Sequence, residues 1–414
     1  MQATFDLGEE PDAQITQVSG KQLHDQLAAF DEFGSSTIVE KSSGVPVYVN
    51  EFWTAKQRAA HSVHEVSYRA CFKPQLPRFF IERLTEVGDL VLDPFTGRGT
   101  TLIESVLLNR RAVGNDVNPI SSMLVVPRVT PPTLQAVGER LAALDLSEAE
   151  ETPEDLLTFY HPDTLREICA LRDHLGKHDT DIVDRWIRMT ATNRLTGHSP
   201  GFFSVYTMPP NQAVTVDRQK LINEKRKQTP EYRDIKKLML RKSKSLLKDV
   251  TPNNELSFDR YGDGTKVAVG SADALRHIDD GNVSLVVTSP PFLDVVQYAT
   301  DNWLRCWFNG IDADTIPIWN FRKADDWQAA MTKVFAELHR VLKPGGHVAF
   351  EVGEVKGGKV KLEDYVIPAG IDGGLEPELV LINAQEFTKT ANCWGVDNQT
   401  KGTNTNRIVL FQKR

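Results

Sequence analysis

The stretch Asp93-Pro-Phe-Thr-Gly-Arg-Gly-Thr-Thr101 joins an apolar run to a run with helical periodicity, and it decides the fold. Residues 88–93 are typical of a buried strand that ends on a carboxylate, and residues 100–109 repeat apolar side chains at helical spacing. Glycines in such a turn let the backbone approach a ligand where open α/β sheets bind theirs. The free N–H groups that start the next helix suit an anion.

Strands and helices alternate on both sides of a long interruption. We predict strands at 111–116, 266–270, 283–288 and 347–352, a helix at 327–342, and a terminal hairpin from 379–387 and 406–412. Parallel strands joined by crossover helices are covered on both faces, and a hairpin adds an antiparallel edge. The sequence therefore predicts an α/β fold with a mostly parallel sheet and a C-terminal antiparallel hairpin.

Residues 131–257 interrupt this alternation with a mainly helical piece, including helices that end near Gly176 and Thr196. Residues 1–60 are weakly patterned, so we predict no elements there. We expect an N-terminal extension over 1–60, a ligand-binding body formed by 61–130 and 258–414, and an inserted helical domain over 131–257.

The composition is that of a globular chain: 414 residues, 40% hydrophobic and 25% charged, enough for two or three units. No apolar run is long enough to span a bilayer, and the start lacks the features of a signal peptide. The four cysteines have neither disulfide nor zinc spacing, and His61 and His64 lack a third ligand nearby. We therefore expect a cytoplasmic protein without a metal site.

The net charge of −8 hides a basic segment. Residues 218–248 contain twelve basic and three acidic side chains, a local charge of +9 that leaves −17 for the rest. Such segregation suggests a face for a polyanion, although a solvated helical face is the alternative.

Asp116 ends the second strand, 23 positions after Asp93, where a carboxylate can bind both hydroxyls of a ribose. Two competing motifs are absent from the turn. A phosphate loop requires a lysine after the last glycine, and the dinucleotide fingerprint requires glycine where Leu102 stands. A tight turn without a ligand is the remaining alternative.

Ser289-Pro-Pro-Phe292 follows the strand predicted at 283–288. An exocyclic amino group on a base is a poor nucleophile because its lone pair is delocalised into the ring. The Ser289 hydroxyl and the Pro290 carbonyl can both accept its hydrogens and so favour the nucleophilic form. Phe292 offers a flat face to an extruded base. The alternative is a proline-stiffened loop after a core strand.

Together these motifs resemble those of the DNA methyltransferases that methylate amino groups with S-adenosylmethionine. Ser-Pro-Pro-Phe is the spelling of the cytosine-N4 branch, whereas adenine-N6 enzymes more often carry Asp-Pro-Pro-Tyr or Asn-Pro-Pro-Tyr. Residues 72–81 are similar to the family's lead-in motif. The resemblance covers roughly 64–125 and 265–353 and implies a Rossmann-like class I methyltransferase fold. The glycine motif precedes the catalytic motif here, the reverse of most such cytosine-N4 enzymes.

The resemblance also implies which residues act. Its cofactor-binding positions are Phe72, Asp93, Pro94, Phe95, Thr96, Gly97, Gly99, Thr100, Thr101, Asp116, Val117, Asp273 and Ala274. Its catalytic positions are Ser289, Pro290, Pro291 and Phe292. We expect Asp116 and Val117 to meet ribose and adenine, and Asp273 to meet the adenine amino group. Tyr298 and Arg305 could line the target cleft, and Glu351 and Glu354 receive no role.

A base in double-stranded DNA must be flipped out before such chemistry. We expect the inserted domain to hold the DNA backbone through Lys225, Arg226, Lys236, Lys237, Arg241 and Lys242. The aromatic side chains of residues 202–206 are either a wedge that fills the gap or the small core of the insert.

The leading hypothesis is a sequence-specific DNA cytosine-N4 methyltransferase, with a cognate restriction endonuclease as a possible partner. Adenine-N6 methylation of DNA is the first alternative, and methylation of an RNA base is the second. A nucleic-acid-binding protein that keeps this fold without catalysis is the third.

Overall fold

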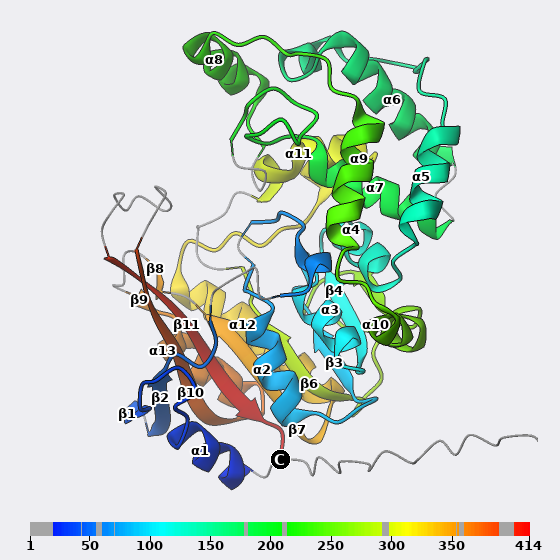
Figure 1. Ribbon diagram of the computed structural model, residues 1–414. Helices are drawn as coiled ribbons and strands as arrows, with labels where there is room; N and C mark the ends of the chain where they lie inside the picture. The colour runs from blue at the N-terminus through cyan, green and yellow to red at the C-terminus, as the bar shows by residue number, and fades with distance from the viewer. Residues whose placement is uncertain are drawn as a thin grey trace, which may run out of the picture.

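The computed structural model describes residues 20–42, 44–54, 60–69, 71–177, 181–208, 213–291, 298–352, 354–355, 360–388 and 401–414. These residues form a large mixed sheet flanked by helices and a lobe of helices that lies above the sheet in Figure 1. Among the described residues, no helix is both long enough and apolar enough to cross a membrane.

The sheet has nine strands in the order β1-β2-β10-β11-β7-β6-β3-β4-β5. Their bounds are β1 Ile38–Ser42, β2 Val45–Asn50, β3 Leu90–Asp93, β4 Arg111–Asp116, β5 Lys266–Val269, β6 Val283–Thr288, β7 Leu342–Val352, β10 Glu376–Thr388 and β11 Lys401–Gln412. Strands β7, β6, β3, β4 and β5 run parallel to one another, whereas β11 pairs antiparallel with both β7 and β10. The predicted α/β class, mostly parallel sheet and C-terminal hairpin are confirmed.

The chain order reverses between β3 and β6. From β3 the sheet grows through β4 and β5 in one direction, and from β6 through β7 in the other. Open α/β sheets bind ligands outside the carboxyl ends of the strands at such a switch point. The fold therefore places the expected site at the ends of these two strands.

The central strands are buried on both faces, which is why their sequences read as continuous apolar runs. In β6, Val286 packs toward α12 (Ala324–Val341) and α13 (Glu363–Asp372), whereas Leu285 and Val287 pack toward α1 (Gly20–Ala28) and α2 (Gln75–Leu84). The helix after the glycine turn is α3, Thr100–Leu107. A two-stranded ribbon is formed by β8 (Glu354–Val355) and β9 (Val360–Lys361).

Residues 38–50, within the N-terminal extension expected over 1–60, join the sheet. Strand β2 pairs in parallel with β10, and β1 pairs with β2 at the sheet edge. Phe52 and Trp53 are buried against Phe79 of α2. The weak pattern has a physical cause, because β1 is exposed along its whole length and shows no apolar alternation.

The lobe of helices is built mainly from the insert. It contains α5 Leu134–Ala143, α6 Pro162–Lys177, α7 Ile182–Arg194, α8 Val216–Arg226 and α9 Ile235–Leu246, with α10 Pro252–Ser257 leading back to the sheet. Single turns lie at η2 Ser62–His64, η3 Glu154–Thr158, η4 Phe258–Gly262 and η5 Ala313–Thr315. The helices that the sequence predicted from 161 to 176 and from 181 to 196 are α6 and α7.

The lobe extends beyond the expected boundaries of 131–257. Helices α4 (Ile120–Val129) and α11 (Tyr298–Phe308) pack Leu124, Leu304 and Phe308 into the same apolar cluster as Trp186. Sequence patterns did not assign α4 and α11 to the lobe, because both helices lie in stretches that otherwise belong to the sheet.

Candidate active site

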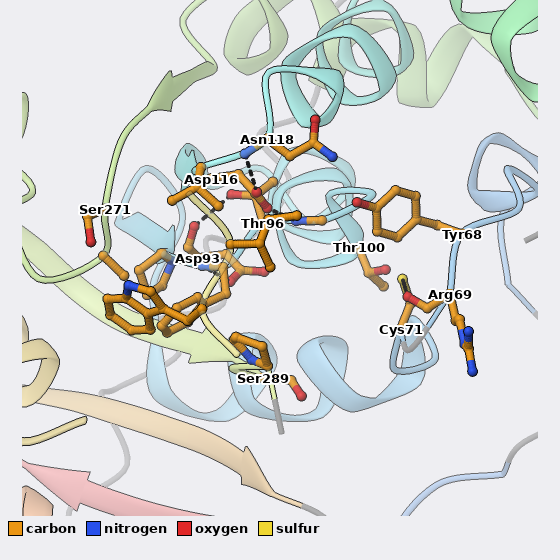
Figure 2. A pocket seen from close by; sticks show the side chains of 18 of the residues that line it. Tyr68, Arg69, Cys71, Asp93, Thr96, Thr100, Asp116, Asn118, Ser271 and Ser289 are labelled. Carbon is orange, nitrogen blue, oxygen red and sulfur yellow. Dashed lines mark hydrogen bonds between the residues drawn. The ribbon is translucent and has the colours of Figure 1, made fainter. Parts of the chain in front are cut away.

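One cavity lies at the carboxyl ends of β3, β4, β5 and β6 and offers about 850 Å³ of space, counting its open mouth. The lining residues are Tyr68, Arg69, Cys71, Phe72, Asp93, Pro94, Phe95, Thr96, Gly97, Thr100, Asp116, Val117, Asn118, Gly270, Ser271, Ala272, Ser289, Pro291, Ile318 and Trp319. Figure 2 shows Asp93, Asp116 and Ser289 around the same space.

Nine of the thirteen residues expected to bind a cofactor line this cavity, and the other four, Gly99, Thr101, Asp273 and Ala274, do not. Gly99 has a φ of 77°, and a Cβ there would stand 2.3 Å from a methyl carbon of Val125, so this glycine permits the packing of α4. Thr101 is buried and donates to the Val287 carbonyl at 3.0 Å. Instead of Asp273 and Ala274, residues 270–272, which directly follow β5, line the cavity.

The carboxylate of Asp116 ties the glycine turn to the end of β4. It accepts a hydrogen bond from the backbone N–H of Gly97 at 2.7 Å and another from that of Asn118 at 2.9 Å. The Thr96 hydroxyl donates to the Asp93 carbonyl at 2.7 Å, which closes the turn against β3. These bonds preform the turn that the sequence predicted.

Two carboxyl groups line this cavity, one on the buried Asp93 and one on the half-buried Asp116. Burial raises the pKa of Asp93 to about 7, an effect opposed by hydrogen bonds from Thr288 and the Phe95 N–H and increased by the neighbouring Asp116. Burial also raises the pKa of Asp116 to about 6. A cationic ligand would favour the ionised form of both groups, because an opposite charge lowers the pKa of a carboxyl.

Asn118 supplies a hydrogen-bond donor that has no partner among the described residues. Its Oδ1 accepts from the Ile120 N–H at 3.0 Å, which fixes the amide, while its buried Nδ2 remains unsatisfied. A buried donor without a partner costs about 1–3 kcal/mol, so a ligand acceptor there would be favoured. Together with two carboxyls and the glycine turn, this donor fits S-adenosylmethionine, which carries ribose hydroxyls, an ammonium, a carboxylate and a sulfonium.

The predicted catalytic corner shares this cavity. Ser289 and Pro291 line it, Pro290 is buried between them, and Phe292 lies outside the described residues. The Ser289 hydroxyl hydrogen-bonds to the carboxyl of Glu351 at the end of β7, and burial raises the pKa of that carboxyl. Asn406 of β11 donates to the same carboxyl at 2.8 Å. Glu351 received no role from the sequence, although its place at a strand end was an available signal.

Sequence reasoning missed the segment that forms one wall of the cavity, Tyr68, Arg69 and Cys71. The guanidinium of Arg98, from the glycine turn, donates to the carbonyls of Val66 at 3.0 Å and Phe72 at 3.3 Å and so holds this segment. No regular element carries these residues, and therefore no periodicity indicated them.

Two further contacts complete this wall. Arg69 forms an ion pair with Asp301 of α11 at 2.6 Å. The expected cleft residue Arg305 is buried and donates to the Ser67 carbonyl at 3.2 Å, so it supports the wall from behind. The opposite side of the cavity includes Trp319, whose ring packs edge-on against Phe95.

His61 and His64 have structural partners, as the sequence suggested. His64 bonds to the buried Glu104 at 2.6 Å, and burial lowers the pKa of this histidine to about 4. His61 bonds to the Asp249 carbonyl at 2.9 Å. Among the described residues, no three His, Cys, Asp or Glu side chains gather to hold a metal ion.

The six basic residues expected to bind DNA fall into two groups. Lys242 is almost buried and donates to the Glu65 carbonyl at 2.6 Å, and burial lowers its pKa to about 8. Lys236 donates to the Leu144 carbonyl, and Arg226 lies over the ring of Tyr206. All three side chains contact the lobe, and Arg226 remains exposed, as are Lys225, Lys237 and Arg241.

The exposed cations of α9 continue past the predicted set. Lys237, Arg241, Lys244 and Lys248 are all exposed and recur every three or four residues, which places them on one face of the helix or its extension. We call these four residues the α9 stripe. Phe202 and Phe203 are buried in the lobe, which agrees with the core alternative for these two side chains, whereas Tyr206 is half-buried beneath Arg226.

Comparison with known proteins identifies similar sequences among DNA methylases. A family model described as DNA methylase matches residues 20–121, which span the N-terminal strands, the glycine turn and Asp116. Type II methyltransferase M.MjaII of Methanocaldococcus jannaschii is 30% identical over 102 residues, covering 24% of this chain and 19% of that protein. Type II methyltransferase M.BsoBI of Geobacillus stearothermophilus is 21% identical over 292 residues, covering 62% of this chain and 54% of that protein.

The chain therefore spans less than two thirds of the length of either relative. Among solved structures, TrmN from Thermus thermophilus matches 85% of this chain and 52% of its own, with 10% identity and a TM-score of 0.32. That likeness is too weak to bear on function.

Proposed function

We propose that this chain is a DNA methyltransferase that transfers a methyl group from S-adenosylmethionine to the exocyclic N4 of cytosine. The observation that carries the proposal is the shared cavity. Ser289 and Pro291 line the same space as Asp93, Gly97 and Asp116, so a group acting on an amine and a site for a charged cofactor face each other. The DNA methylase match over 20–121 supports this assignment.

Cofactor binding is assigned to the preformed turn and its neighbours. Asp116 would take the ribose hydroxyls, and Asn118 would donate to an acceptor of the same molecule. Asp93 and the start of α3 would face the charged methionine part, because a carboxylate attracts a cation and helix N–H groups attract an anion. When bound, S-adenosylmethionine supplies an electrophilic methyl group on a sulfonium.

The catalytic corner acts on the amine. Ser289 Oγ and the Pro290 carbonyl accept the two amino hydrogens, and Glu351, which bonds to Ser289, leaves the lone pairs of Oγ for that task. With S-adenosylmethionine bound, the corner would hold the amino nitrogen with its lone pair free to accept the methyl group, and the surplus proton would pass to water. Since the methylated ammonium is acidic, orientation and fixed dipoles supply most of the acceleration.

Double-stranded DNA is the proposed substrate, held by the lobe of helices. The α9 stripe and Lys225 are exposed cations that are available for phosphates, whereas Lys236 and Lys242 hydrogen-bond to carbonyls of the protein. Phosphate contacts position a duplex without reading its sequence. As the similar proteins M.MjaII and M.BsoBI are type II methyltransferases, we also propose a sequence-specific enzyme of the cytoplasm with a cognate restriction endonuclease.

The proposed target base rests on the residues of the motif Ser289-Pro-Pro-Phe292. Serine at position 289 favours cytosine N4, and adenine N6 is the second candidate because the amine chemistry is the same. The test is incubation of the chain with DNA and labelled cofactor, followed by mass spectrometry of nucleosides. N4-methylcytosine is the expected product. N6-methyladenine alone would overturn the base assignment. If the protein binds the cofactor but no labelled nucleoside forms, the enzyme assignment is overturned.

A further inference from the structure

Trp327, outside the cavity, touches the catalytic corner. Its indole Nε1–H donates to the carbonyl of Pro291 at 2.9 Å. Pro291 lines the cavity, whereas Trp327 is fully buried near the start of α12. The bond therefore connects the corner to the apolar core beneath it.

The corner has few other means of attachment. The β6–β7 ladder ends with the pair Thr288 and Phe350, so the following residues lose sheet pairing. Pro290 and Pro291 have no backbone N–H, and neither residue can donate a main-chain hydrogen bond. At Pro290 and Pro291 the carbonyl groups are therefore the only polar groups that can anchor the chain.

Trp327 is itself held firmly. It belongs to a cluster of fully buried side chains on α12, which includes Met331, Val334 and Leu338. Close-packed interiors hold side chains in single rotamers, and a buried indole N–H requires a partner. The rigidly held Nε1–H therefore fixes the position of the Pro291 carbonyl through their hydrogen bond.

Three different elements anchor the corner around Pro290. Thr288 donates to Asp93 of β3 at 2.6 Å, Ser289 bonds to Glu351 of β7, and Pro291 accepts from Trp327 of α12. We propose that Trp327 is a positioning residue. It fixes the Pro291 peptide and so keeps the carbonyl and hydroxyl acceptors of the corner oriented toward the target amine. This inference rests on the proposed function.

The test replaces Trp327 by Phe, which keeps an aromatic ring and removes the donor. Single-turnover methyl transfer at saturating DNA and cofactor should slow about 10- to 100-fold, since a misplacement of about 1 Å can cost 10²-fold. The cofactor Kd should stay within about threefold, because Trp327 does not line the cavity. A slower transfer step with unchanged cofactor affinity is a result that a general loss of stability would not give.

Trp186→Phe is the matched control. Trp186 is also fully buried, and its Nε1–H donates to Ser243 at 2.9 Å in the lobe of helices. This variant loses the same kind of bond, and its transfer rate under saturating conditions should equal that of the wild type. Equal slowing in both variants would assign the effect to stability and overturn the positioning role.

A second variant keeps the test decisive if Trp327→Phe does not fold. Benzothienylalanine at position 327 retains the two-ring shape and replaces only the N–H by sulfur. A wild-type transfer rate in either folded variant overturns this role and leaves the proposed function intact. If the wild-type protein binds the cofactor but methylates no DNA, the proposed function is contradicted, and so is the positioning role of Trp327.

Discussion

The hydroxyl of Thr288, the last residue of β6, donates to the carboxylate of Asp93, the last residue of β3, at 2.6 Å. Both side chains are buried, so this bond joins the strand of the catalytic corner to the strand of the cofactor turn at the switch point of the sheet. The two motifs, 195 residues apart in sequence, are thereby one structural unit.

Replacing Thr288 by Val should weaken cofactor binding. The Thr288 hydroxyl lowers the pKa of Asp93, so its loss raises that pKa further and leaves less carboxylate at neutral pH. Calorimetry at pH 7 should show a Kd about 3- to 10-fold larger, since a one-unit shift is about 1.4 kcal/mol. Thr332→Val is the control, because Thr332 bonds only within α12, to the Gln328 carbonyl. An unchanged Kd in Thr288→Val would refute the prediction.

Cofactor binding should tighten as the pH rises from 5.5 to about 7.5. The pKa of Asp93 is about 7 and that of Asp116 about 6, so the free site is partly protonated below neutrality and must release protons to hold a cation. Calorimetry in buffers of different ionisation enthalpy measures this release. In Asp93→Asn the affinity at pH 8 should fall about tenfold or more, and most of the pH slope should disappear.

Asp93 should affect stability with the opposite pH dependence. Its folded pKa lies above its ordinary value of 3.8, so its contribution is full below about pH 4 and is lost as the pH rises through 7. The free energy of unfolding of the cofactor-free protein should therefore decline over that window more steeply than that of Asp93→Asn. Chemical denaturation at several pH values compares them, and parallel curves would contradict this effect.

Asn118→Asp should separate the two tasks of this side chain. The remaining oxygen still accepts from the Ile120 N–H, so the local turn should keep its conformation. The donor Nδ2 is lost, and the cofactor Kd should rise about tenfold, in the range expected for an unmade bond in a buried site. Equal affinity in both proteins would show that Nδ2 does not face the ligand. Asn115→Asp cannot serve as the control, because Asn115 Nδ2 donates to the Gly270 carbonyl and its loss would break a bond within the protein.

Neutralising Lys237, Arg241 and Lys244 to Gln should flatten the salt dependence of DNA binding. Each lost phosphate contact reduces the slope of log K against log salt by about 0.9. The control neutralises three exposed lysines of the sheet body, Lys41, Lys266 and Lys333, with the same change in net charge. Fluorescence anisotropy over a salt series measures both slopes. Identical slopes in the two triple variants would place the DNA elsewhere.

The sequence predicted those parts of the fold in which local pattern and tertiary packing agree. Strand β6 is buried on both faces, and its apolar run and the proline corner after it stand out without further information. The glycine turn has its own chemistry, since Gly97 and Gly99 adopt positive φ in the structure. These features depend on neighbours in sequence, which is why sequence reasoning finds them.

What escaped prediction depends on long-range contacts. Tyr68 and Arg69 lie in irregular chain that Arg98 holds from another element, and Trp319 reaches the cavity from the connection between α11 and α12. The division of the basic segment also escaped, because Lys242 and Lys237 look alike in sequence and only packing against Glu65 separates them.

The shared core of the lobe of helices has a consequence for protein engineering. Leu124 and Phe308, from chain on either side of the insert, complete that core, and Arg69 is joined to Asp301 across the two parts. A chimera that exchanges residues 131–257 alone would cut through this packing and leave apolar surface bare on both fragments. Grafting a new specificity onto this scaffold therefore requires crossover points outside α4 and α11.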